Sequence, residues 1–168
     1  ITTPWVHQMI GDLYSAQRIG EPLAAIPLMT TNGDSTILAA TDGKISFLHF
    51  WLPGCEASSG AYKYLISPAE EHFKDDNQVE FVYVSHDNKP DRWLKNIQSG
   101  DFASESALNL NTPGTGHPFL KYYNIHRYPS YMVIDKDGNV INVGNVPNTP
   151  EELIEYLDSL KHQNLPTP

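Results

Sequence analysis

The chain of 168 residues is 40% hydrophobic and has a formal net charge of −9, with its eleven lysines and arginines scattered along the sequence. This length allows one well-buried core and is too short for two comfortable domains. The acidic charge disfavours nucleic acid and anionic lipid as partners, and no apolar run is long enough to span a membrane.

The N-terminal segment predicts a helix. Thr3-Pro4 is typical of a helix start, and apolar residues with helical spacing follow, which predicts one buried face: Val6, Met9, Ile10 and Leu13. The chain begins at Ile1 without an initiator Met or a signal-like leader, so we expect a processed or trimmed product. We define residues 1–18 as a helical extension, which ends before Gly20 and Pro22.

A hairpin and a buried strand come next. The stretch Ile26–Leu38 predicts two short strands around a turn at Asn32–Asp34. The run Ile45–Trp51 is almost continuously apolar, as expected of a central strand that is covered on both faces. Pro53-Gly54 ends this strand.

The following segment predicts a strand-helix-strand unit. Apolar residues at helical spacing after Cys55 predict a helix that runs to about Phe73. Ser67–Glu70 resembles a capping box, so we expect the helix to kink or restart there. Val79–Ser85 predicts a second buried strand, parallel to the first.

The C-terminal half predicts two more helices and a hairpin. Pro90–Ile97 is amphipathic, whereas 99–116 is rich in Ser, Asn, Gly and Thr and predicts a loop. Tyr131–Ile134 and Val140–Val143 form the clearest hairpin. Thr149–Glu152 then starts a last helix with one apolar side: Leu153, Leu157 and Leu160. This order predicts an α/β fold with a central mixed sheet and helices on both faces.

Cys55 is the only cysteine, which excludes an internal disulfide and leaves the redox compartment open. It lies between a predicted strand and a predicted helix. At a helix N-terminus a thiolate is stabilised by unpaired N–H groups and the helix dipole, which lowers its pKa. Alternatively, a lone cysteine after a strand is a small buried apolar residue. Both interpretations are compatible with the residues alone.

Several motifs in register resemble the TlpA/ResA-like thiol–disulfide oxidoreductases of the thioredoxin-like superfamily. The principal motif is Phe50-Trp51-Leu52-Pro53-Gly54-Cys55, where this family has a Phe-Trp pair followed by its first active-site cysteine. Further similar stretches are Ile19–Pro22, Ser85–Asp87 with Trp93, Tyr122–Ile125, Tyr128–Ser130 and Ile134–Gly138. The resemblance implies a thioredoxin fold with an N-terminal helix and β-hairpin extension. It implies a thioredoxin-like domain over 19–163 and a C-terminal tail over 164–168.

Four positions depart from the family pattern. Gly54 replaces a tryptophan, Ser58 the second cysteine, Ala61 a glutamate and Lys63 a proline. The site is therefore Cys-x-x-Ser, in which Ser58 cannot resolve a mixed disulfide. An engineered replacement at Ser58 would trap such an intermediate, but several departures together favour natural divergence.

The resemblance assigns roles around the thiol. Cys55 and Ser58 take the two catalytic positions. The fold implies a cis peptide bond before Pro129, which would present the backbone of Tyr128 to an extended client peptide. Trp51 and Gly54 complete the expected substrate-binding set. The alternatives are an ordinary turn proline at Pro129 and a core role for Trp51.

Two other chemistries are disfavoured. Five histidines show no paired metal-ligand spacing, so we expect no metal and no other cofactor: His49, His72, His86, His117 and His126. His117 and His126 lie near the cis-proline loop in sequence, and both could reach the cleft. A peroxiredoxin would have threonine and proline where this chain has Leu52 and Leu48.

Two functions remain in competition. The first is monothiol thiol–disulfide exchange, oxidoreductase- or isomerase-like, on extracytoplasmic proteins, with disulfide- or thiol-containing clients or a redox partner. The resemblance implies a bacterial, periplasmic or otherwise extracytoplasmic location and leaves open a membrane anchor before Ile1. The second is a redox-inactive thioredoxin-like module that binds proteins or peptides.

Overall fold

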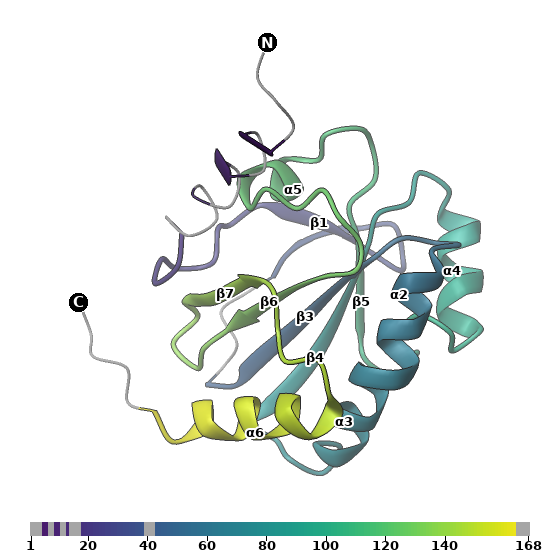
Figure 1. Cartoon of the computed structure of the whole chain (residues 1–168). Coiled ribbons are helices and arrows are strands. Elements are labelled where there is room, and N and C mark those ends of the chain that lie inside the picture. Colours follow the sequence, from purple (N-terminus) through teal and green to yellow (C-terminus); the bar gives the residue numbers. More distant parts are fainter. Residues whose placement is uncertain (1–4, 7–8, 11–12, 14–17, 39–42, 164–168) are drawn as a thin grey trace.

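Seven strands form one mixed sheet in a computed structural model that describes residues 5–6, 9–10, 13, 18–38 and 43–163 (Figure 1). The strands are β1 (Pro27–Thr30), β2 (Ser35–Ile37), β3 (Ile45–Trp51), β4 (Val79–Ser85), β5 (Leu108–Asn111), β6 (Ser130–Ile134) and β7 (Val140–Gly144). Their order is β2-β1-β5-β4-β3-β6-β7. β3, β4 and β5 are parallel, and the outer pairs are antiparallel. The predicted mixed sheet and both predicted hairpins are confirmed.

β3 lies inside the sheet, and its side chains are all buried. It pairs in parallel with β4, from Ile45 opposite Val79 to Trp51 opposite Ser85. Other elements cover both faces of these two strands, which explains why both are nearly continuous apolar runs. The carboxyl end of β3 therefore opens at the edge of the sheet where parallel strands present functional loops.

A continuous helical segment follows β3, made of α2 (Glu56–Ala61), η1 (Tyr62–Ile66) and α3 (Ser67–His72). The expected change in the helix at Ser67 is present, since α3 begins there directly after η1. The expected capping box is wrong, because Ile66 and Ser67 both have helical backbone angles and no side chain caps α3. Instead, the wider π-helical turn η1 precedes Pro68. A π-turn relieves the clash that a proline ring makes with the carbonyl group four residues earlier.

Helices cover the two faces of the sheet unequally. α4 (Pro90–Gln98) and α6 (Pro150–Lys161) bury Trp93 and Leu157 in the same apolar cluster as Phe47 of β3. α5 (Pro118–Tyr122) packs Phe119 in the cluster on the opposite face. The predicted start of α6 is confirmed, since the Thr149 hydroxyl accepts a hydrogen bond from the Glu152 amide at 3.3 Å.

β5 and α5 are not among the predicted elements, and β5 lies in the segment predicted to be a loop. Its sequence, Leu-Asn-Leu-Asn, has low strand propensity, and yet Asn109 and Asn111 are buried. Their side-chain amides donate to backbone carbonyl groups, including that of Asp87. These hydrogen bonds allow polar side chains inside the sheet.

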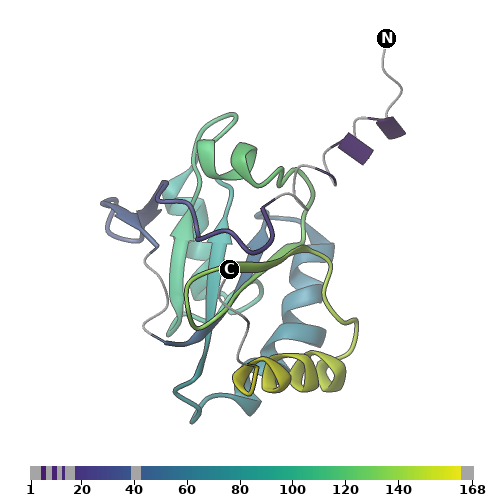
Figure 2. The ribbon, with the colours of Figure 1, turned by 90° about the vertical axis from the view of Figure 1, so that its left-hand side faces the viewer.

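The N-terminal extension is described only in part. Five of its residues have helical backbone, and Figure 2 shows them standing away from the sheet: Trp5, Val6, Met9, Ile10 and Leu13. The expected buried face is wrong for Met9, Ile10 and Leu13, which are exposed. The rest of 1–17 and the tail at 164–168 lie outside the described residues, among which no helix has the length and apolarity for a membrane crossing.

Candidate functional site

The turn after β3 places Cys55 at the start of the helical segment. Gly54 has a φ of 78°, a left-handed conformation that glycine adopts readily. The Cys55 amide donates to the Leu52 carbonyl at 3.1 Å. Cys55 has extended angles at the N-cap of α2, and its carbonyl accepts from the Ser59 amide at 3.1 Å. The thiol is partly exposed rather than buried in apolar packing.

The surroundings of Cys55 favour its thiolate. The Ser58 hydroxyl makes the strongest contribution, a hydrogen bond that lowers the pKa of the Cys55 thiol, and the Ser58 and Ala57 amides act in the same direction. Partial burial and the Glu56 carboxylate oppose this effect, but the pKa remains below its ordinary value. Ser58 is wholly buried, and its hydroxyl also accepts from the Leu52 amide at 3.4 Å. At neutral pH a larger fraction of Cys55 is therefore thiolate, the attacking form, than of a free thiol.

The backbone of Tyr128 lies next to the Cys55 thiol. The Cys55 Sγ lies 3.9 Å from the Tyr128 carbonyl oxygen, although the residues are 73 positions apart in sequence. The Tyr128–Pro129 peptide bond is cis, which confirms that expectation. Burial raises the pKa of Tyr128 to about 12, so the phenol is neutral. The structure thus brings Cys55, Ser58, Gly54, Tyr128 and Pro129 together.

Contacts of His86 support the loop that carries Tyr128, and the sequence analysis did not identify them. The His86 ring stacks on the Tyr128 ring, with centroids 6.1 Å apart and planes within 3°. The His86 Nδ1 donates to the Thr112 carbonyl at 2.6 Å. The Asn111 side chain accepts from the Asp87 amide at 3.0 Å and donates to its carbonyl at 2.8 Å. These hydrogen bonds join the segments after β4 and β5. In the sequence, the only signal for this connection is the pair of asparagines in β5.

The other histidines occupy different places. His117 caps α5, where its Nδ1 accepts from the Phe119 amide at 3.2 Å. Burial, and then the nearby His86, lower the pKa of His117. His126 is exposed, and its Nδ1 lies 2.8 Å from the Asn124 carbonyl. His49 is wholly buried in β3, and burial lowers its pKa to about 3. Among the residues that the structure describes, no group of three or more His, Cys, Asp or Glu is arranged to hold a metal ion.

Trp51 has a core role. Its ring is wholly buried and stacks on Phe102, with centroids 5.1 Å apart. A ring without exposed surface cannot touch a bound client. The expectation that Trp51 belongs to the substrate-binding set is therefore corrected in favour of the core alternative.

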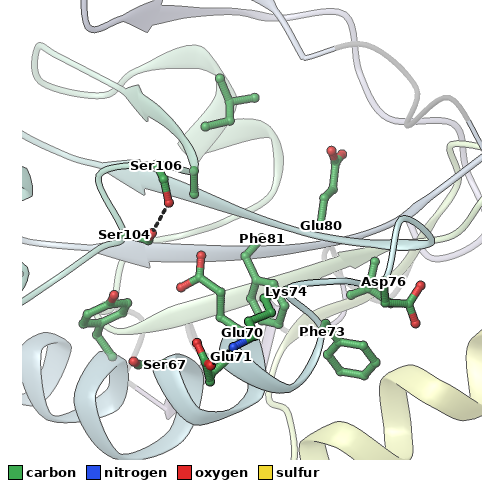
Figure 3. A pocket seen from close by; sticks show the side chains of 14 residues that line it. Ser67, Glu70, Glu71, Phe73, Lys74, Asp76, Glu80, Phe81, Ser104 and Ser106 are labelled. Carbon is green, nitrogen blue, oxygen red and sulfur yellow. Dashed lines mark hydrogen bonds and ion pairs between the residues drawn. The ribbon is translucent and has the colours of Figure 1, made fainter.

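A cavity of about 530 Å³ lies away from Cys55 (Figure 3). It is lined by η1, α3, β4 and the segment before β5. In it, Glu70 accepts from the Tyr83 hydroxyl at 2.6 Å, and burial raises the pKa of Glu70. The hydroxyl groups of Ser104 and Ser106, on the segment before β5, lie 3.0 Å apart in the wall of the same cavity. Glu70 lies nine residues beyond Ala61, about 13 Å along a helix at 1.5 Å per residue. It therefore cannot stand in for the glutamate that Ala61 replaces.

Comparisons with known proteins agree with this fold. A family model described as thioredoxin-like matches residues 43–140. No curated protein matches the chain. Among solved structures, the thioredoxin domain of a thiol-disulfide oxidoreductase from Bacteroides vulgatus has a TM-score of 0.66 at 21% identity, covering 84% of this chain and 96% of that one.

Two further structures are similar. A thiol:disulfide interchange protein from Bacteroides sp. has a TM-score of 0.68 at 20% identity, covering 87% of this chain and 91% of that one. A secreted disulfide oxidoreductase from Mycobacterium tuberculosis, homologous to DsbE of E. coli, has a TM-score of 0.62 at 19% identity, covering 81% and 96%. At these identities the likeness shows the fold.

Proposed function

Because this chain belongs to the thioredoxin-like family, we propose that it carries out thiol–disulfide exchange on protein clients outside the cytoplasm through Cys55. The observation that carries the proposal is the placement of a partly exposed thiol, with a lowered pKa, 3.9 Å from the Tyr128 carbonyl. A thiolate is the attacking species in disulfide exchange. The fold thus offers a nucleophile beside a backbone to which a peptide can bind.

In the proposed reaction the Cys55 thiolate attacks one sulfur of a client disulfide. A bond forms between the two sulfurs, the client disulfide breaks, and the second client sulfur leaves as a thiolate. Ser58 has no thiol with which to attack the Cys55 sulfur. Release therefore depends on a client thiol, which gives isomerisation, or on an outside thiol, which completes reduction of the client.

We assign client binding to the backbone at Tyr128, with Pro129 and Gly54 beside it. An extended peptide that pairs with exposed backbone gains hydrogen bonds whatever its sequence, which suits many clients. The secreted disulfide oxidoreductase among the similar structures supports an extracytoplasmic location.

A redox-inactive binding module is the competing function. Ser58 and Ala61 favour it, since neither can take part in resolving a mixed disulfide. The lowered pKa of Cys55 favours exchange instead, because a merely structural thiol has no need of a stabilised thiolate.

Trapping of a covalent complex tests the proposal. We expect the native protein, incubated with the disulfide-linked dimer of a one-cysteine peptide, to form a mixed disulfide at Cys55 that dithiothreitol releases, as seen by intact mass under non-reducing conditions. The Cys55→Ala variant should form none. If the native protein forms no complex while the urea-unfolded protein does, the fold suppresses the thiol and the binding module is the correct function.

A further inference from the structure

A second side of Cys55 opens into a cavity of about 330 Å³. Its walls come from the start of the helical segment and from the Asp101-Phe102 segment after α4. Tyr128 and Pro129 are not among its lining residues. Cys55 therefore lies between the backbone assigned to the client and a separate space, whose volume is at the lower end of the range for small-molecule sites.

An ion pair and an aromatic ring define the chemistry of this cavity. The Lys63 ammonium lies 2.7 Å from an Asp101 carboxylate oxygen, and each side chain keeps nearly half of its surface exposed, 45% and 48%. Phe102, stacked on Trp51, adds apolar surface. Both charges of the pair thus remain accessible to a ligand that carries the two opposite charges.

Glu56 is the third charged residue of the lining. With one cation and two carboxylates, the cavity disfavours a simple anion and favours a ligand that includes an ammonium group. A carboxylate on the same ligand would meet Lys63. A zwitterionic head group matches both members of the pair.

We propose that this cavity binds a low-molecular-weight zwitterionic thiol, an amino-acid thiol or short thiol peptide, as the co-reactant that releases clients from Cys55. The inference rests on the proposed exchange function and names its missing partner. Ser58 occupies the inner approach to the Cys55 sulfur, and its hydroxyl cannot replace the second thiol. The cavity gives a small thiol access to the Cys55 sulfur from the protein surface.

The reaction is balanced with two molecules of the small thiol. The first thiolate attacks the Cys55 sulfur of the mixed disulfide, forms a new disulfide with Cys55, and releases the client sulfur as a thiolate. The second attacks this adduct, leaves as the symmetric disulfide and returns Cys55 to the thiolate. The client disulfide gains two electrons, and the two small thiols lose them.

The reverse half-reaction provides the test, with L-cystine as the zwitterionic probe and 2-hydroxyethyl disulfide as the uncharged one. Formation of each mixed disulfide at Cys55 is followed by intact mass. We expect Lys63→Gln and Asp101→Asn each to lower the rate with cystine by about fivefold, the upper range for exposed charge pairs. The rate with the uncharged probe should change by no more than about twofold. Lys95→Gln, which removes a charge from α4, should alter neither rate.

The two proposals fail differently. If native protein reacts with neither probe, the exchange function is wrong and this inference falls with it. If both probes react and the ratio of their rates is the same in wild type, Lys63→Gln and Asp101→Asn, the zwitterion site is wrong and the exchange function stands. A fall in both rates together would show a disturbed thiol and would also overturn the site.

Discussion

Replacing Ser58 with cysteine is expected to convert the site to a dithiol and to shorten the lifetime of a client mixed disulfide by at least about 1000-fold. The Ser58 hydroxyl is hydrogen-bonded to the Cys55 thiol, so a sulfur at this position lies within reach of the bond to be broken. Well-oriented intramolecular groups react with effective molarities of about 10⁵ M or more, far above millimolar outside thiols. Lifetimes after rapid mixing and acid quench measure the change.

The same variant should oxidise to an internal disulfide between Cys55 and the introduced thiol, seen as the loss of two hydrogens by intact mass. Ser159→Cys is the matched control, because it adds a second thiol on the exposed side of α6. The control should keep the long-lived mixed disulfide of the wild type. If Ser58→Cys also keeps it, position 58 does not face the reacting sulfur and the proposed geometry is wrong.

Asn111→Ala is expected to lower the free energy of unfolding by about 2–6 kcal/mol. Asn111 is wholly buried, and its amide satisfies both the N–H and the C=O group of Asp87. Its removal leaves two buried backbone groups without their partner, at about 1–3 kcal/mol each. The midpoint of urea unfolding measures the loss.

Asn96→Ala provides the comparison, since its amide makes one exposed hydrogen bond to the Arg92 carbonyl. We expect a change of no more than about 0.5 kcal/mol there. Equal midpoints for Asn111→Ala and Asn96→Ala would contradict the role given to Asn111 in joining the segments that support His86 and Tyr128.

The central strands were predictable because burial on both faces leaves a simple sequence signal. β3 and β4 are runs of apolar residues between turn residues, and α6 has a capping threonine and a leucine side. β5 lacks such a signal, because its burial is supported by hydrogen bonds of Asn109 to nearby backbone and of Asn111 to the backbone of Asp87, 24 positions away. Tertiary contacts of this kind override strand propensity and cannot be seen locally.

The candidate site was predictable only through motifs in register. Cys55 and Tyr128 are far apart in sequence, and pairing of β3 with β6 brings their segments together. The burial of Trp51 depends on its stacking with Phe102, which the sequence does not indicate. The Lys63–Asp101 pair likewise joins a helix to a distant segment, so the cavity beside the thiol emerges only in three dimensions.

The pH dependence of Cys55 alkylation by iodoacetamide tests the central claim, that the fold activates this thiol, most directly. Because the folded pKa is lowered, the rate should reach half of its maximum at a lower pH in native protein than in urea-unfolded protein, where a thiol titrates at about 8.5. Ser58→Ala, which removes the strongest stabilising contact, should move the native midpoint upward. A native midpoint equal to or above the unfolded one would contradict an activated Cys55.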